Sequence, residues 1–217
     1  MLSDEGRQGG EGAWHGAGRL PRDERVLNRT RKGHSGMSRY ERWISASFAT
    51  ARFEQFMGSL VQGLGRLDIS LGEGDQLFLA NFEENKESVT EAMKLTDRFT
   101  LSHLWVLGAY ELVRTICQRI AENRTAVPEE IARSFEELKR EFTRLRVPLA
   151  KMESASAHKN TDSRIAYPAL SPTRGIGWEV AQGVFISRQD LADHLLATLE
   201  DARSKDPKLT PPGSIGA

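Results

Sequence analysis

The sequence has little cysteine: Cys117 is the single one among 217 residues. A lone thiol excludes an intrachain disulfide, and small secreted domains commonly depend on such bridges. We therefore expect a protein of a reducing, cytoplasmic compartment, and a bacterial one.

Long hydrophobic runs and net charge are absent as well. The most apolar stretch, 104–110, ends at Glu111 and falls well short of the about 20 residues that span a bilayer. Thirty basic residues balance thirty acidic ones, so no global field would hold the protein on a nucleic acid or an anionic membrane. We expect no membrane partner, and RNA binding would need a local basic patch.

The motifs of metal and cofactor chemistry are also missing. The five histidines are scattered, with no pair at metal-ligating spacing. The glycine pairs at 72–74 and 175–177 lack the lysine of a phosphate-binding loop, and no G-x-S-x-G elbow is present. The sequence therefore predicts no metal site, no cofactor and no hydrolase triad.

The two ends of the chain lack apolar periodicity. Residues 1–36 are rich in glycine, arginine and charge, which predicts a disordered leader. Because periodic sequence begins directly after Met37, we hypothesise that Met37 is the true start. Residues 204–217 contain three prolines and are predicted to form a disordered tail. A single helical-bundle domain is expected over 37–203, with a long loop near 154–175.

What the remaining sequence does contain is helical periodicity. The predicted fold class is all-α, an up-and-down bundle of about five helices, with a small β-hairpin before the last helix. The predicted segments are a first helix over 38–67, one or two shorter helices in the acidic stretch 68–91, a central helix over 98–123, a long helix from Pro128 to Met152, a hairpin within 176–186 and a last helix from its cap at Ser187 to about 203.

The long helix carries the clearest pattern in the chain. Its apolar residues repeat at spacings of four and three, like the seam of a coiled coil: Ile131, Phe135, Leu138, Phe142, Leu145, Leu149 and Met152. Pro148 interrupts the backbone hydrogen bonds but not the pattern, which predicts a kink and not a stop. Such a seam can pack within one chain or against a second copy, so we hypothesise a homodimer or a protein partner.

Two residues at the start of the central segment stand at a spacing with chemical meaning, Arg98 and His103. Here the chain resembles the HEPN (higher eukaryotes and prokaryotes nucleotide-binding) superfamily, helical bundles in which an arginine followed by a histidine often forms a metal-independent ribonuclease site. The resemblance implies that arginine grips phosphate and histidine transfers protons, across a dimer. If Thr100 caps the helix, both residues lie near free amides; if Asp97 caps it, they lie about 140° apart and a partner subunit is needed.

The same motif recurs elsewhere in the chain. Arg188 and His194 form a second candidate catalytic pair, early in the last helix, and Arg29 and His34 repeat the spacing in the leader. Histidine 103 has a simpler interpretation as a first-turn residue in contact with solvent. The sequence leaves these alternatives open.

Further polar residues follow His103 along the central helix. Tyr110, Glu111 and Arg114 are the candidate binding residues, as an exposed local ion pair or as a buried network with Gln118. On the long helix, basic residues outnumber acidic ones. They predict a solvated face balanced by the acidic stretch 68–91, or else a phosphate-binding stripe.

Two functions are compatible with these features. The first is a non-catalytic helical module that dimerises or binds a partner through the long helix or the hairpin, with Trp178 as a lid packed over one end of the bundle. The second is an RNA-cleaving or RNA-binding protein of the HEPN type that uses one of the Arg-His pairs.

Overall fold

The structure is a computed structural model that describes residues 36–122 and 127–205. The predicted leader and tail lie outside these ranges, apart from Gly36, Ser204 and Lys205. In chain order the elements are α1 (Arg39–Ser47), η1 (Phe48–Thr50), α2 (Met57–Ala80), α3 (Phe82–Asn85), α4 (Val89–Glu122), α5 (Glu129–Lys151), η2 (Ser156–His158), β1 (Tyr167–Ser171), β2 (Gly175–Ala181), β3 (Val184–Ser187) and α6 (Arg188–Lys205).

The described part of the chain is mostly helical but not purely all-α. An antiparallel sheet in the order β1-β2-β3 precedes α6. Strands β2 and β3 correspond to the predicted hairpin, whereas β1 lies in the stretch that we expected to be a loop. Pro168 argued against a strand here, because proline is depleted from the central strands of sheets. It is tolerated in β1 because β1 is an edge strand of the sheet.

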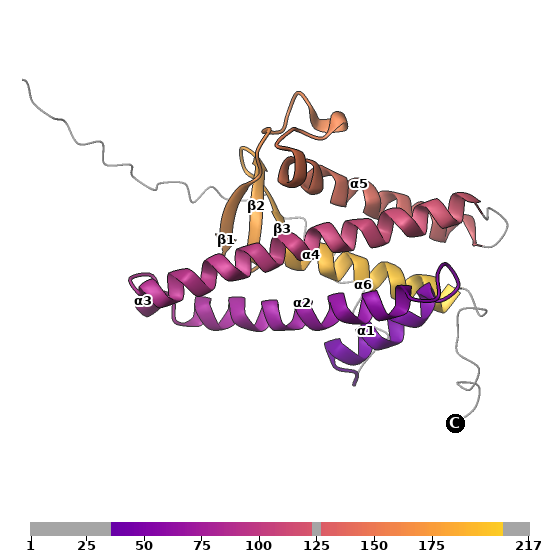
Figure 1. Cartoon of the computed structure of the whole chain (residues 1–217), viewed down its shortest axis with the longest axis horizontal. Coiled ribbons are helices and arrows are strands. Elements are labelled where there is room, and N and C mark those ends of the chain that lie inside the picture. The colour runs from indigo at the N-terminus through magenta and orange to yellow at the C-terminus, as the bar shows by residue number, and fades with distance from the viewer. Residues whose placement is uncertain (1–35, 123–126, 206–217) are drawn as a thin grey trace, which may run out of the picture. The chain divides into compact units, whose positions relative to one another are not determined.

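The helices pack side by side as expected for a bundle. Helix α2 runs beside α4, α4 beside α5, and α6 lies between α5 and α1 (Figure 1). The centre of the core holds Trp43, Trp105, Phe135 and Phe142, each with no exposed surface. Trp178 is 2% exposed and joins this core from β2, which confirms that its side chain is packed.

The predicted first helix is wrong in its continuity. The helical segment ends after η1, and the chain turns through residues 51–56 before α2 begins. No proline or glycine marks this break, and the apolar stripe continues because α1 and α2 bury residues in the same core. The start of α1 is well specified: Glu41 N donates to Ser38 Oγ (3.3 Å) and Ser38 N donates to the Glu41 carboxylate (2.7 Å).

Helix α4 begins at Val89, nine residues before the predicted start. The hydroxyl of Ser88 accepts a hydrogen bond from Glu91 N (3.3 Å). Thr100 and Asp97 are therefore interior residues, and neither is the helix cap that we considered.

The prediction for α5 is confirmed from Ile131 to Leu145 but is wrong at its end, because Met152 is 68% exposed and follows the last helical residue in a left-handed conformation. The five seam residues from Ile131 to Leu145 are 0–1% exposed, and the helix continues past Pro148 to Lys151. Full burial of five large side chains outweighs the cost of one proline, about 3 kcal/mol. The seam is buried within its own chain, so it is not available to a second copy.

The α6 cap is also confirmed, because Asp190 N donates to Ser187 Oγ (3.2 Å). Among the described residues, no helix is both long and apolar enough to cross a membrane.

Candidate functional site

Two aspartates of α2 are buried in the interior of the bundle. Asp68 is 2% exposed and Asp75 is 3% exposed. They stand seven residues apart, which is about two helical turns, so both face the same side of α2. Buried carboxylates require charged or hydrogen-bonded partners, and each aspartate draws its partners from distant segments.

Asp68 is held by three donors. Arg188 Nη1 donates to its Oδ1 (2.5 Å), and Arg39 Nε (2.6 Å) and Trp43 Nε1 (3.0 Å) donate to its Oδ2. Arg188 is itself 1% exposed and is the first residue of α6. The contact therefore ties α1, α2 and α6 together through one carboxylate.

Asp75 is held less completely. Ile176 N of β2 donates to its Oδ2 (3.1 Å), while Oδ1 lies 3.5 Å from Arg98 Nε and has no hydrogen bond. Burial raises the pKa of Asp75, and the hydrogen bond from Ile176 together with the nearby arginines opposes that rise. Gly175 is required here because its φ is +64° and a Cβ would lie 2.6 Å from Asp75 Oδ2.

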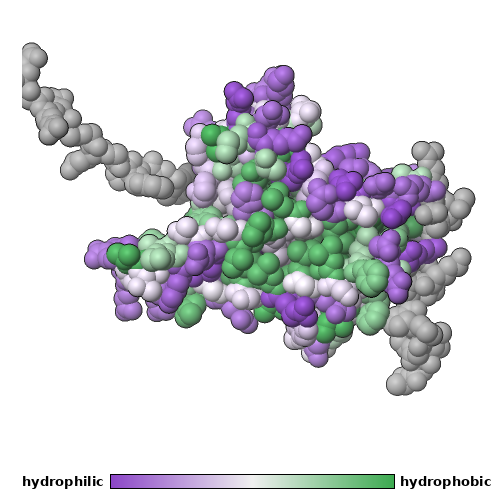
Figure 2. Space-filling view, viewed as in Figure 1, coloured by the Kyte–Doolittle hydropathy of each residue, from purple (hydrophilic) through white to green (hydrophobic). Residues whose placement is uncertain are grey.

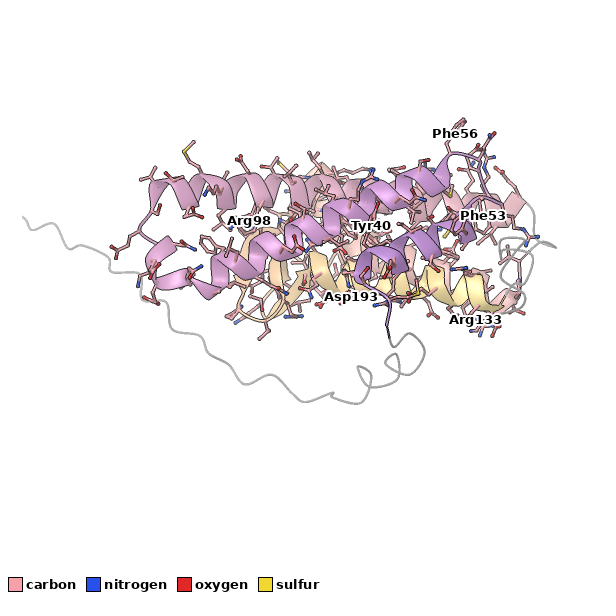
Figure 3. All side chains as sticks on the ribbon, turned by 90° about the horizontal axis from the view of Figure 1, so that it is seen from below. Tyr40, Phe53, Phe56, Arg98, Arg133 and Asp193 are labelled. Atoms are coloured by element: carbon pink, nitrogen blue, oxygen red, sulfur yellow. The ribbon has the colours of Figure 1, made fainter. Side chains whose placement is uncertain are left out.

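Arg98 lies between α2 and α4 (Figure 3). Its guanidinium stacks on the ring of Phe78, with 5.1 Å from Cζ to the ring centroid. Its Nε and Nη2 atoms are buried and have no hydrogen-bond partner. A cavity of about 230 Å³ lies beside it, lined also by Lys94, Asn81 and Asn85.

Together these residues form a buried ionic network of Arg39, Asp68, Asp75, Arg98 and Arg188. Within this network three cations face two buried anions, and Arg39 also pairs with the exposed Asp193. Guanidinium nitrogens of all three arginines have no hydrogen-bond partner. We did not predict Asp68, Asp75 or Arg39 as site residues, and we predicted Arg188 with another role. One signal was present: two aspartates at a seven-residue spacing among the apolar residues of α2.

The first predicted pair does not form one site within the chain. Arg98 and His103 are both interior residues of α4 and point about 140° apart around its axis. Arg98 faces Asp75, whereas His103 is half-buried and burial lowers its pKa. The arrangement matches the alternative in which a second subunit would have to complete the pair.

The second predicted pair is also separated. The Arg188 guanidinium is bound to the buried Asp68, whereas His194 lies at the surface and its Nδ1 contacts the Glu141 carboxylate of α5. The side chain of His194 is 46% exposed. The two residues therefore have different partners and different environments.

The His194–Glu141 contact predicts a small pH effect. The hydrogen bond to Glu141 raises the pKa of His194 above its usual value. Its contribution to stability is therefore fully present below the unfolded-state pKa of about 6.5 and is lost as the pH rises through the folded-state pKa. Both side chains are more than a third exposed, so we expect less than about 1 kcal/mol.

Urea unfolding of the wild-type protein and of His194→Gln at pH 5.5 and at pH 9 measures this effect. The advantage of the wild type is expected at the lower pH only. An equal difference at both pH values would contradict the assigned contact.

The candidate binding residues of α4, Tyr110, Glu111 and Arg114, form the exposed local ion pair that was one of the two predicted arrangements. Arg114 Nε donates to the Glu111 carboxylate (2.6 Å), and both side chains are nearly half exposed. The ring of Tyr110 is half-buried beneath the guanidinium of Arg146, at 5.0 Å. This is a local surface ion pair and not a buried network.

The basic residues of α5 do not pair with the acidic stretch 68–91, which we expected to balance their charge. Their ion pairs lead to neighbouring acids and not to the stretch 68–91: Arg133 to Glu129, Lys139 to Glu136, Arg144 to Asp162 and Arg146 to Glu111. The expected acidic counterpart is wrong, because α2 directs Asp68 and Asp75 into the core. The pairing reduces the charge left for a phosphate stripe.

Metal and thiol chemistry have little support in the described part of the chain. No group of three or more histidine, cysteine, aspartate or glutamate side chains there is arranged to hold a metal ion. Burial raises the pKa of Cys117 to about 12, which keeps the thiol protonated and unreactive at neutral pH.

The buried ionic network is therefore the best-defined polar site in residues 36–122 and 127–205. Comparison with known proteins found no matching family model, no matching curated protein and no matching solved structure, so the function has to be argued from this geometry alone.

Proposed function

We propose that the protein is a non-catalytic helical module that forms a homodimer through the outward face of α4. The observation that carries this proposal is a line of exposed leucines on that face. Leu101 is 41% exposed and Leu104 is 56% exposed, and the half-buried Leu107 and Gly108 continue the line. We call these four residues the α4 stripe.

The surface around the α4 stripe is also apolar. Leu60 of the adjacent α2 is 46% exposed. Figure 2 shows hydrophobic residues gathered at the centre of the face that α4 and α2 present. Exposed large side chains are common singly, but a contiguous group on one face is typical of an interaction surface.

A second copy is the partner that the α4 stripe fits best. Leu104 lies close to the midpoint of α4, which runs from Val89 to Glu122. A two-fold axis near Leu104 would pack the same patch of two antiparallel helices against itself, which is the commonest symmetry of homo-oligomers. A stripe near one end of the helix would give a shorter overlap between the two copies of α4.

The charges beside the stripe constrain the packing angle. Asp97 and Glu111 lie seven residues to either side of Leu104, about 10.5 Å along the axis. In a closely aligned antiparallel pair, Asp97 of one copy would face Glu111 of the second copy, and the two carboxylates would repel each other. A crossing angle of about 50° keeps the leucines in contact and separates the carboxylates, so we expect crossed helices.

The test is the oligomeric state of two matched variants. Leu104→Glu places a charge at the centre of the interface and is expected to give a monomer. Leu77→Glu makes the same change at a side chain that is 68% exposed near the end of α2, and it should leave the dimer intact. Sedimentation equilibrium at roughly 100 μM, where a micromolar dimer is mostly assembled, measures both.

Two results would overturn the proposal. A wild-type protein that is monomeric at this concentration has no dimer to explain. A Leu104→Glu variant that keeps the wild-type mass while remaining folded would place the interface elsewhere.

RNA cleavage by an Arg-His pair stays a prediction from the sequence. The cavity beside Arg98 is not lined by His103, and the cavity beside Arg188 is not lined by His194. The phosphate-gripping role is also difficult for Arg188 while it is bound to Asp68. The contacts support the interaction module over this alternative.

A further inference from the structure

Two pairs of exposed apolar side chains lie beyond the α4 stripe. Val89 is 76% exposed and Met93 is 66% exposed, both near the amino end of α4. Phe56 is 73% exposed at the cap of α2, one turn before the exposed Leu60. A standard interface takes about 800 Å² and roughly 20–30 residues from each partner, so the four residues of the α4 stripe are too few for a stable dimer.

Both pairs lie on the side from which a second copy would approach. Met93 and Val89 precede Leu104 by 11 and 15 residues, so they point within about 60° of Leu104 around the helix axis. Phe56 points toward the side of the molecule on which α4 is outermost (Figure 3). The α4 dimer therefore has unused apolar surface on two separate segments of each copy.

The packing of α2 against α4 places Leu60 relative to the centre of the α4 stripe. Leu64 O accepts a hydrogen bond from Trp105 Nε1 (2.9 Å), and Leu64 Cδ2 is 3.5 Å from the position that a Cβ of Gly108 would take. Helices α2 and α4 run in opposite directions (Figure 1). Leu60 therefore stands beside α4 at a level about seven residues beyond Leu104, toward the carboxyl end.

A crossing angle of about 50° carries the amino end of one α4 over a neighbouring helix of the second copy. Met93 is about 16.5 Å from Leu104 along the axis, which puts it about 13 Å to the side of the other α4 and about 11 Å along it. That distance along the helix is about seven residues, the level of Leu60, and packed helices are about 8–10 Å apart.

The hand of the crossing decides which helix is covered. The commonest class of helix packing has an angle of about −50°. With this hand, a second copy in front of the page in Figure 1 has its α4 running between upper left and lower right, and its amino end lies over α2. The opposite hand would place that end over α5.

We propose that Val89 and Met93 of each copy pack against Phe56 and Leu60 of the other copy. The proposal rests on the α4 dimer and fixes the hand of its crossing. The two-fold axis repeats the contact, so it adds apolar surface on both sides of Leu104. The far end of α2, with the exposed Leu77, stays uncovered.

The test is cross-linking of cysteine pairs with a short bis-maleimide. Met93→Cys with Leu60→Cys is expected to give a covalent dimer, and neither single variant should. Met93→Cys with Arg146→Cys reports the opposite hand and should give none, because Arg146 of α5 lies over Tyr110 on the other side of α4. The natural Cys117 is only 4% exposed, so it should not react.

Two outcomes would overturn the contact and leave the α4 dimer standing. One is a covalent dimer from the Arg146 pair. The other is no product from the Leu60 pair although the wild type sediments as a dimer and Leu104→Glu as a monomer. A monomeric wild type would overturn the contact and the dimer together.

A double-variant cycle measures the contact in solution. Met93→Lys and Leu60→Glu are each expected to weaken the dimer at least ten-fold, because each places a charge in an apolar contact. With both changes in one chain, each lysine meets a glutamate of the other copy, so the double variant should dimerise more tightly than either single variant. Additive weakening in the double variant would contradict the contact.

Discussion

Replacement of Asp68 by alanine is expected to lower the free energy of unfolding by about 3–5 kcal/mol, the usual cost of leaving a buried charge without its partner. Among the described residues, Asp68 is the carboxylate that accepts a hydrogen bond from the buried Arg188, and it also accepts from Trp43. Removal of its oxygens leaves both donors unsatisfied inside the core. Urea denaturation followed by circular dichroism measures the change.

Asp193→Ala is the matched control for this prediction. Asp193 contacts the same Arg39, but its side chain is 51% exposed (Figure 3). Water can replace an exposed partner, so the loss should stay below about 1 kcal/mol. Equal losses at the buried and the exposed aspartate would contradict the importance that we give to burial.

A double variant separates the charge from the packing. Asp68→Leu together with Arg188→Met replaces the ion pair by apolar side chains of similar length. Apolar replacement of a buried ion pair is often neutral or stabilising, so we expect recovery of the part of the loss in Asp68→Ala that comes from the unpaired Arg188. The part that comes from Trp43 Nε1 and Arg39 Nε remains, because both still lack their acceptor. Recovery would mean that the network contributes to the specific arrangement of the helices more than to net stability.

Two glycines of α2 are expected to respond in opposite directions to the same substitution. A Cβ at Gly65 would lie 2.5 Å from Cγ of Trp43, whereas a Cβ at Gly63 would meet nothing within 4 Å. Gly63→Ala should stabilise the protein by about 0.5–1 kcal/mol, because alanine favours a helix. Gly65→Ala should destabilise it by about 1–3 kcal/mol through overpacking.

The opposite signs depend on the immobility of Trp43. Its ring is fully buried, and its Nε1 is bonded to Asp68 (3.0 Å), so the ring has little freedom to move away from an added methyl group. Thermal unfolding of the two variants under identical conditions measures the difference. Stabilisation by both alanines would show that Trp43 adapts at little cost, and that the contact between α1 and α2 is looser than described.

The features that we predicted correctly are those that depend on residues close together in the sequence. The α5 seam from Ile131 to Leu145 is a periodic pattern within one helix, and the cap at Ser187 needs only the amide three residues later. Helical periodicity and capping act over one or two turns. A single sequence therefore contains the information that they need.

The element boundaries were less predictable. The turn between α1 and α2 contains no breaker, and β1 contains a proline that argued against a strand. In both places tertiary packing outweighs the local preference. The apolar stripe could not separate one helix from two, because both bury their residues in the same core.

The candidate site was decided by the tertiary structure. Asp68 and Arg188 are 120 residues apart, and Asp75 meets Ile176 at a separation of 101. A seven-residue spacing of aspartates shows which side of α2 they occupy, but only the packing of α1, α4, β2 and α6 against that side supplies the donors. Local periodicity thus determined which segments are helical. The pairing of the buried charges depended on which distant segments pack together, because a buried charge is stable only where the fold brings its partners to it.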